Sequence, residues 1–322
     1  MDTMANKDIN TLIQKLSSSL VQKYDDESFY NYIKNAFDKY ISELTEYGQD
    51  VEILLNQTNE LVGKATYRRF SNLMKKINSC CLDILECAYS GDILSATIKL
   101  SNLLSVCKYT DYKLMDVYAN YLQNERVFDK ELFRCVDFDR GEKPDNCNHV
   151  PFDLRQKASK GRFNQLGFPC LYLSNSLECA QKEIGETVKE GKSRWYGVFV
   201  PQRTLCFADF SIPSNDDILT MTDYDKFAFL ITYPLRLLCL TPAKHEDAAF
   251  IEEYTFSQLF LHILFLNNNV LPHFDGICYT SLKDLRSLNF VIPAKYKSQT
   301  PPTSGISDNI KAMITEIKVE RI

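Results

Sequence analysis

Histidine is scarce in this 322-residue chain, and proline is missing from the first part of it. It has four histidines, at positions 149, 245, 262 and 273, and no proline before Pro144. So few histidines leave little material for histidine-based catalytic triads or metal clusters. Neither a Walker-type nor a Rossmann-type glycine pattern occurs, so neither of these common nucleotide-binding loops is predicted.

Metal-binding patterns of cysteine are also missing, although the chain has eleven cysteines. No Cys-x-x-Cys pair occurs, and Cys147-Asn148-His149 is the one close grouping of Cys and His. A structural zinc site needs four ligands, usually supplied by two such pairs. We therefore predict no metal site, and we expect buried or free thiols in a reducing cytosol.

Long apolar runs and an excess of basic residues are lacking as well. The net charge of −5 and the pI near 5.5 give no strong signal for nucleic-acid binding. Pro234, Arg236 and His262 interrupt the most apolar runs, Phe227–Leu240 and Phe256–Leu266, and both runs are shorter than the ~20 residues that a membrane helix needs. The N-terminus has no apolar leader. These absences predict a cytoplasmic protein without a membrane partner.

The first part of the chain has the pattern of amphipathic helices. Apolar residues recur at three- and four-residue spacing, as in the stripe Phe29, Ile33, Phe37, Tyr40, Ile41 and Leu44. Strand-like alternation is absent there. We predict an all-α helical bundle over residues 1–126, with a regulatory or oligomerisation role, and we expect a homo-oligomer.

From about Leu132 the chain is rich in short β-type segments, separated by Gly, Pro, Asn and Asp. The predicted strands are Leu132–Val136, Cys170–Leu173, Trp195–Val200, Leu205–Phe210, Ile277–Tyr279 and Phe290–Ile292. With a few helices between them, they predict a compact mixed domain over residues 131–296 and an α+β fold for the whole chain. Residues 297–322 are interpreted as a linker, Lys297–Gly305, and a C-terminal tail whose last seventeen residues are expected as a short terminal helix or strand.

The most informative segment is a loop, a strand and a helix in close succession. Gly161-Arg162-Phe163-Asn164 is followed by the strand around Tyr172 and by a helix predicted from near Asn175-Ser176 to Gly191. On that helix the buried stripe is expected to be Leu177, Ala180, Ile184 and Val188. Glu183 lies at the edge of this stripe, where a carboxylate can be half-buried and still face a cleft.

Each candidate residue also has an ordinary structural interpretation. Arg134 interrupts an apolar strand, where an arginine usually faces solvent or pairs with a carboxylate, but its planar fork also suits phosphate. The glycine loop is either a plain turn or a close approach of backbone to a ligand. Glu183 is either a surface glutamate or a site residue, and Ser281 at a strand end usually just caps a neighbouring element.

Taken together, these residues resemble the RES domain, a family of toxins from toxin–antitoxin pairs. The resemblance covers about residues 131–295, and Glu253-Tyr254-x-x-x-Gln258 and Asp275-Gly276-Ile277-x-Tyr279-x-Ser281 continue it in order. The arginine, glutamate and serine that name the domain map onto Arg134, Glu183 and Ser281. Phe163 stands where many members have tryptophan.

The resemblance implies an ADP-ribosyltransferase-like fold and NAD as the substrate, with no tightly bound cofactor. Glu183 would stabilise the oxocarbenium character of the ribose through its 2′-hydroxyl. Arg134, supported by Arg162, would neutralise the pyrophosphate, and Tyr172 would stack on the nicotinamide or adenine ring. Ser281 would hydrogen-bond the nicotinamide amide or the ribose. The expected substrate-binding residues are Gly161, Arg162, Asn164 and Tyr279.

Three activities stay open at this point. The main expectation is cleavage of the nicotinamide–ribose bond by hydrolysis or phosphorolysis, in a toxin with a cognate antitoxin. The second is transfer of ADP-ribose to a host protein, and the third is a non-enzymatic interaction module. Some N-terminal extensions of large RES proteins are likened to HEPN domains, whose ribonucleases use an Arg-x-x-x-x-His motif. No histidine precedes His149 in this chain, so a nuclease activity of the N-terminal helices is not expected.

Overall fold

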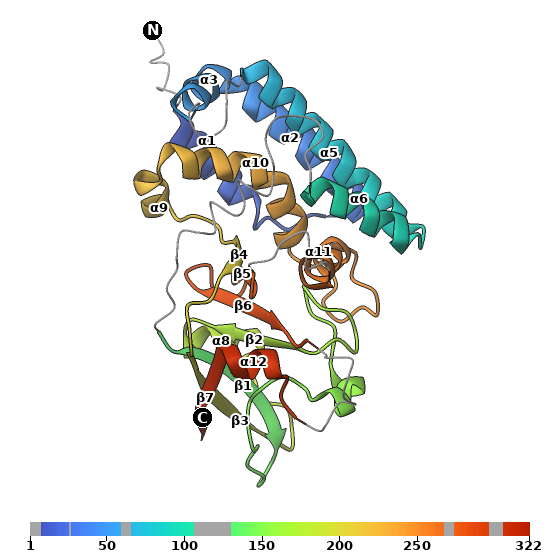
Figure 1. The fold of residues 1–322 in the computed structure, drawn as a ribbon, viewed down its shortest axis with the longest axis vertical. Coiled ribbons are helices and arrows are strands. Elements are labelled where there is room, and N and C mark those ends of the chain that lie inside the picture. Colours follow the sequence, from blue (N-terminus) through green and yellow to red (C-terminus); the bar gives the residue numbers. More distant parts are fainter. Residues whose placement is uncertain (1–7, 26, 59–65, 106–129, 267–273, 296–304) are drawn as a thin grey trace. The chain divides into compact units, whose positions relative to one another are not determined.

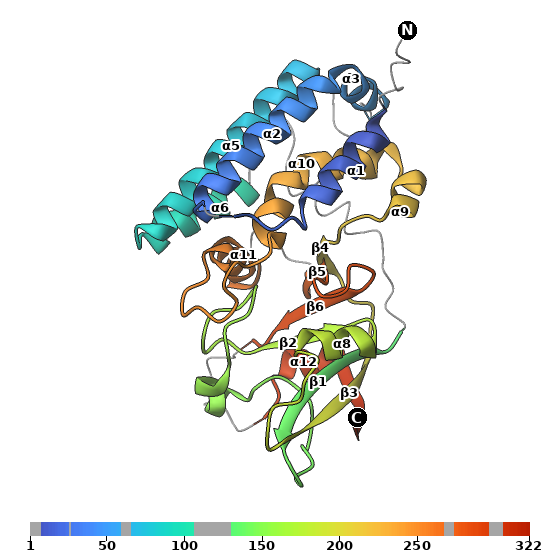
Figure 2. The ribbon, with the colours of Figure 1, turned by 180° about the vertical axis from the view of Figure 1, so that it is seen from behind.

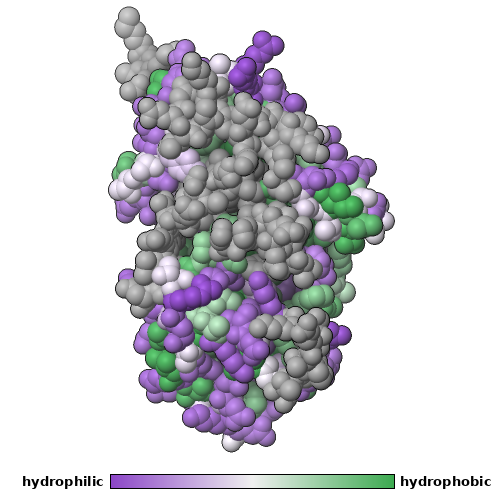
Figure 3. Space-filling view, viewed as in Figure 1, coloured by the Kyte–Doolittle hydropathy of each residue, from purple (hydrophilic) through white to green (hydrophobic). Residues whose placement is uncertain are grey.

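The computed structural model of the protein describes residues 8–25, 27–58, 66–105, 130–266, 274–295 and 305–322 (Figure 1). By its internal contacts the chain divides into a unit of Met1–Tyr121 with Ile212–Leu271, here called the helical unit, and a unit of Leu122–Ser211 with Pro272–Ile322, the sheet unit. The α+β class predicted from the sequence is confirmed. On the face drawn in Figure 3, hydrophobic residues of the described part form small, separate groups among hydrophilic ones.

The helical unit begins with amphipathic helices, as the apolar spacing predicts. They are α1 (Ile9–Ser19), α2 (Phe29–Glu46), α3 (Gly48–Gln57), α5 (Tyr67–Tyr89) and α6 (Ile93–Ser105). Side chains of Asp8, Ser28 and Thr66 cap α1, α2 and α5 by accepting a backbone N–H of the first turn. The predicted stripe of α2 is buried, apart from Ile41, which is half-buried.

A second group of helices, from inside the predicted 131–296 domain, belongs to the same unit. They are α9 (Asn215–Thr220), α10 (Asp223–Leu240), the short η2 (Glu252–Tyr254) and α11 (Thr255–Leu266). Helix α10 contacts α1, α2, α3 and α5. Its side chains are buried on all sides from Phe227 to Leu240, as expected of a helix without a polar face. The contacts thus divide the chain differently from the predicted boundaries.

The sheet unit is built on seven strands in the order β4-β5-β6-β2-β1-β3-β7. They are β1 (Leu132–Asp139), β2 (Cys170–Ser174), β3 (Lys192–Pro201), β4 (Phe207–Phe210), β5 (Gly276–Thr280), β6 (Leu288–Pro293) and β7 (Ile314–Arg321). Only β4 and β5 pair in parallel, and the other neighbours are antiparallel. All six strands predicted from the sequence are present.

The last seventeen residues, expected as a short terminal helix or strand, contain both. Residues 305–322 contain the short helix α12 (Asp308–Met313) and β7, which pairs with β3 along its length. Strand β7 lies at the edge of the sheet, and its burial pattern is mostly exposed. Charged residues such as Glu316, Lys318 and Glu320 are common on edge strands, and they weaken the apolar signal of a strand in the sequence.

Helices lie on the two opposite faces of the sheet, α12 in front in Figure 1 and α8 (Leu177–Glu183) in front in Figure 2. Ile310 and Met313 of α12 pack in the core cluster with Leu171, Leu173 and Phe290, which share one face by register. We call this the α12 face. The other, the α8 face, carries Tyr172, Ser174 and Asn289, because side chains alternate along each strand.

Helix α8 is shorter than predicted. Ser176 caps it as expected, by accepting the N–H of Cys179, but the helix ends at Glu183 instead of near Gly191. Gly185 follows with a φ of +96°, a conformation that glycine adopts readily and that ends helices. Ile184 and Val188, expected in the buried stripe, are 37% and 43% exposed. Glu183 is therefore the last helical residue, next to an irregular segment. A short 3-10 helix, η1 (Phe152–Lys157), precedes the glycine loop.

Candidate active site

Glu183 and Ser281, which are distant in the sequence, meet on the α8 face. The Ser281 hydroxyl donates to Glu183 Oε1 at 2.6 Å. Asn289 of β6 donates from Nδ2 to the same Oε1 at 2.5 Å. Glu183 is exposed, whereas Ser281 is 0% and Asn289 3% exposed. The exposed carboxylate at the end of α8 is thus held through one oxygen by two buried donors.

Ser281 is fixed by the turn that follows β5. Its Oγ accepts the backbone N–H groups of Lys283 and Asp284, at 3.1 and 3.0 Å. Its own N–H donates to the carbonyl of Ser287 at 2.9 Å. Because its one hydroxyl proton goes to Glu183, Ser281 has none left to donate to a substrate in this arrangement. Its geometry is that of a residue that positions Glu183, in place of the predicted contact with nicotinamide or ribose.

The glycine loop is held against β2 by Tyr172. The Tyr172 hydroxyl donates to Asn164 Oδ1 at 2.8 Å and accepts the Phe163 N–H at 3.2 Å. A Cβ at Gly161 would lie 2.5 Å from Asn164 Oδ1 and 2.6 Å from the Tyr172 hydroxyl. Only glycine therefore fits at 161 without moving these atoms, which gives a physical reason for the glycine at the start of the motif.

Asn164 closes the loop from inside. Its Nδ2 donates to the carbonyls of Ser159, Gln165 and Phe168, at 2.9, 3.1 and 3.1 Å. Asn164 is 5% exposed. Asn164, predicted to bind substrate, stabilises the loop through these hydrogen bonds.

Aromatic packing holds the same loop on the α8 face. The ring of Phe163 is buried and lies 5.1 Å from that of Tyr279, centroid to centroid, and 6.4 Å from that of Phe210. Tyr279 is 6% exposed, so it supports the loop from below. Arg162, between Gly161 and Phe163, is 9% exposed. The loop therefore carries a nearly buried cation onto the face where Glu183 lies.

Arg134 is not among the hydrogen-bond partners of Glu183 in the described residues. Phe133 pairs with Ser174, so the next residue, Arg134, points to the α12 face, opposite Gly197 of β3. Burial lowers the pKa of Arg134, and its electrostatic neighbours are Cys147, Glu316, Cys170 and Tyr172, which raise it. Its Nη1 is buried without a hydrogen-bond partner among the described residues. The backbone of Arg134 thus faces the α12 face, while its charge still interacts with Tyr172 of the glycine-loop cluster, and its contact with pyrophosphate stays a prediction.

A family model described as the RES domain matches residues 132–302, more than half of the chain. The chain belongs to the RES domain family. A relative of this RES protein is a Bacillus subtilis (strain 168) protein named "Putative toxin YopC", 26% identical over 186 residues. The matched part is 52% of this chain and 41% of YopC, so the chain spans about two fifths of that relative's length. No solved structure matches the chain.

The glutamate of the Glu253 motif makes its contacts within the helical unit. Glu253, in the helical unit, is 3% exposed. Its Oε1 accepts the Tyr24 hydroxyl at 2.6 Å and the Lys244 N–H at 2.8 Å. These contacts join the loop before α11 to the segment between α1 and α2. In this chain the glutamate therefore has a structural role within the helical unit.

Metal ligands and membrane helices are not found in the part of the chain that the structure describes. No group of three or more His, Cys, Asp and Glu side chains there could hold a metal ion. Of the Cys147-Asn148-His149 grouping, His149 is engaged on both ring nitrogens, with Val150 O at 2.8 Å and Ser307 N at 2.9 Å. Among the same residues, no helix combines the length and the hydropathy needed to cross a bilayer.

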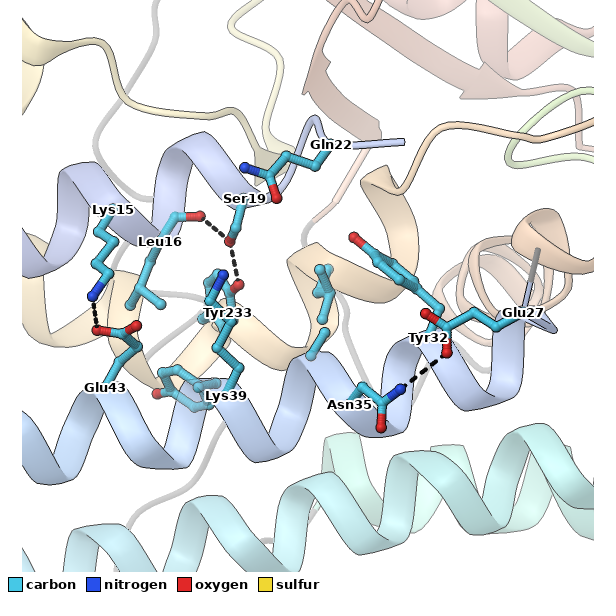
Figure 4. A pocket seen from close by; sticks show the side chains of 13 residues that line it. Lys15, Leu16, Ser19, Gln22, Glu27, Tyr32, Asn35, Lys39, Glu43 and Tyr233 are labelled. Carbon is cyan, nitrogen blue, oxygen red and sulfur yellow. Dashed lines mark hydrogen bonds and ion pairs between the residues drawn. The ribbon is translucent and has the colours of Figure 1, made fainter. Parts of the chain in front are cut away.

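The helical unit has a cavity of about 190 Å³ between α1, α2 and α10 (Figure 4). Its polar side chains largely bind one another: Lys15 pairs with Glu43 at 2.5 Å, and Ser19 shares a hydrogen bond of 2.6 Å with Tyr233. Asn35 Nδ2 donates to Glu27 Oε2 at 2.9 Å. Because these groups are already paired, the cavity offers little polar chemistry to a ligand, and we assign none to it.

Proposed function

We propose that this RES protein is a toxin that cleaves the nicotinamide–ribose bond of NAD, by hydrolysis or phosphorolysis. The observation that carries the proposal is the carboxylate of Glu183, exposed but held through Oε1 alone. Its Oε2 has no hydrogen-bond partner among the described residues. A fixed carboxylate with one open oxygen suits a developing positive charge better than a mobile surface glutamate does.

The reaction needs charge stabilisation more than proton transfer. As the bond between ribose C1′ and the nicotinamide nitrogen breaks, its electron pair leaves with nicotinamide, which becomes neutral. The ribose acquires oxocarbenium character, and an oxygen of water or phosphate then forms the new bond to C1′. In the proposal, Glu183 Oε2 accepts a hydrogen bond from the ribose 2′-hydroxyl and offsets the charge on the sugar.

In the proposal Arg162 is the main contact of the NAD pyrophosphate, and Arg134, whose charge interacts with Tyr172, is the second candidate. Arg162 lies on the loop that Tyr172 and Phe163 hold over the α8 face. A guanidinium is suited to two phosphate oxygens because its N–H donors form a planar fork. Tyr172 keeps its proposed stacking role for the ring, while its hydroxyl serves the loop. We further propose a cognate antitoxin as partner, in keeping with the name of the YopC relative.

The test is to incubate the purified protein with NAD, with and without phosphate, and to identify the products. We expect nicotinamide together with ADP-ribose, or with its 1″-phosphate when phosphate is present. Glu183→Gln should lower kcat by about 100-fold or more, because the charge is lost while the shape is kept. Glu178→Gln is the matched control, since Glu178 lies on the same helix, is 66% exposed and pairs only with Lys182.

Other outcomes would favour a different activity. Label from NAD that appears on an added protein would support ADP-ribose transfer, and absence of turnover with every acceptor would support a non-enzymatic module. Full turnover by Glu183→Gln would contradict the role of this carboxylate. Arg162→Ala is expected to raise KM for NAD more than Arg134→Ala, and the reverse order would restore the original assignment of Arg134.

A further inference from the structure

Asn289 is part of a short chain of hydrogen bonds that ends on Glu183. The Ser174 hydroxyl of β2 donates to Asn289 Oδ1 at 2.5 Å, and Asn289 Nδ2 donates to Glu183 Oε1 at 2.5 Å. Ser174 and Asn289 are directly paired in the β2–β6 ladder, so their side chains leave the sheet side by side. Neither residue belongs to the arginine–glutamate–serine set that the sequence suggests.

The direction of the Asn289 amide follows from its partners. Ser174 Oγ and, more weakly, Cys179 Sγ at 3.7 Å both approach Oδ1 as donors. A carboxylate can only accept, so the end of the amide that faces Glu183 must be the NH₂ group. The reversed amide would set an oxygen against Glu183 and an NH₂ group against the Ser174 hydroxyl. The carboxylate of Glu183 therefore sets the direction of the amide, and Ser174 holds the amide in that direction by donating to Oδ1.

Both donors to Glu183 converge on the same oxygen. Ser281 and Asn289 reach Oε1 from β5 and β6, while no described residue is bonded to Oε2. Glu183 itself is the last residue of a short helix, followed by Gly185 with positive φ, so the backbone alone restrains it little. The orientation of the carboxylate is set by these two hydrogen bonds.

We propose that Asn289, oriented by Ser174, is a positioning residue that aims Oε2 of Glu183 at the substrate's sugar. The inference deepens the proposed function and rests on it. Asn289 contributes through Glu183 and does not touch the substrate. Loss of this hydrogen bond frees the carboxylate to rotate, which lowers the rate of bond cleavage and leaves the binding of NAD to the loop unchanged.

The test compares Asn289→Leu, Ser174→Ala and Ser174→Thr with the wild type. A hydrogen bond to a charged group contributes enough that Asn289→Leu should lower kcat about 10- to 100-fold, with KM for NAD within about twofold. Ser174→Ala should lower kcat by a smaller factor, also with little change in KM. Ser174→Thr, which keeps the hydroxyl, should retain most of the wild-type kcat. The double variant should be no slower than Asn289→Leu, because Ser174 acts through Asn289.

Ser307→Ala is the matched structural control. Ser307 is 5% exposed, close to the 3% of Ser174, and its hydroxyl donates to Lys295 O at 2.9 Å, on a segment that does not contact Glu183. It should leave kcat unchanged. Thermal melting of each variant shows whether it is folded. If Asn289→Leu does not fold, the kcat of Ser174→Ala tests the proposal in its place.

The outcomes separate the two proposals. If the wild type consumes NAD and folded Asn289→Leu and Ser174→Ala keep its kcat, the positioning role is overturned while the proposed function stands. If the wild type does not consume NAD, the proposed function fails, and crystal structures of the wild type and the folded variants decide the positioning role. A Glu183 side chain that rotates in the variants supports the role, and one that keeps its orientation overturns it.

Discussion

Tyr40 should be unusually important for the stability of the helical unit, because it compensates for a proline. Pro234 lies inside α10 and has no N–H to donate to the carbonyl four residues earlier, that of Leu230. The Tyr40 hydroxyl, from α2, donates to that carbonyl at 2.7 Å. Tyr40 and Leu230 are 1% and 0% exposed, so water cannot easily replace the bond.

The expected cost of Tyr40→Phe follows from this geometry. A buried carbonyl left without a partner costs about 1–3 kcal/mol of unfolding free energy. Pro234→Ala supplies a new N–H that can reach the Leu230 carbonyl within the helix. In the Pro234→Ala background Tyr40→Phe should therefore cost less, by roughly 1 kcal/mol or more. Losses of aromatic packing, such as the contact of Tyr40 with Tyr233, are the same in both backgrounds and cancel.

The assay is urea unfolding of the wild type, both single variants and the double variant, followed by far-UV circular dichroism. The coupling free energy is the difference between the costs of Tyr40→Phe in the two backgrounds. Equal costs would refute the reasoning, because they would mean that the Leu230 carbonyl does not depend on Tyr40. A change in the denaturant slope would show that a variant altered more than stability.

Two further predictions concern the sheet unit. Gly161→Ala should lower the free energy of unfolding by about 2–4 kcal/mol, from overpacking and the displaced Tyr172–Asn164 hydrogen bond, and should impair NAD turnover. Gly48→Ala is the control, because its Cβ would lie 3.6 Å from Tyr67, and similar melting temperatures of the two variants would contradict the clash at Gly161. Burial raises the pKa of the Cys135, Cys147 and Cys170 thiols to about 12, so at pH 8 only ~1 in 10,000 of them is a thiolate. Iodoacetamide should therefore not modify these thiols in the native protein, which peptide mass mapping can check. The unfolded chain releases the thiol protons near pH 9 and the folded chain does not. The stability that these thiols contribute is therefore complete below pH 9 and is lost as the pH rises towards 12. Urea midpoints that do not fall above pH 9 would contradict this.

Strands with alternating or continuous apolar residues were predictable from the sequence. Glu183 and Ser281 were named together by the resemblance to the RES domain, and the structure joins them by a hydrogen bond. Asn289 and Ser174 were not predicted, since a polar residue inside an apolar strand gives no signal of its own. Their partnership depends on the pairing of β2 with β6, which brings residues 115 positions apart into one rung of the ladder. Sequence spacing does not determine which strands are neighbours.

The sequence also does not determine on which face of the sheet a strand residue lies. Arg134 was expected at the site because the resemblance maps the arginine of the RES domain onto it. Its side depends on the register of β1, where Phe133, and not Arg134, pairs with Ser174. A shift of one residue would exchange the two faces. The assignment of the arginine to one face or the other therefore required the structure, even though the strand itself was predicted correctly.

The helical unit is not an appended domain that ends near residue 126. Helices α9, α10 and α11 come from within the span that matches the RES family, yet they pack with the N-terminal helices. The chain enters and leaves this unit in the middle of the match, between β4 and β5. Helix α10 is apolar on all sides and contacts α1, α2, α3 and α5, so without these helices it would expose a surface that a soluble domain cannot leave uncovered. The N-terminal helices are thus part of what makes this version of the RES sequence fold.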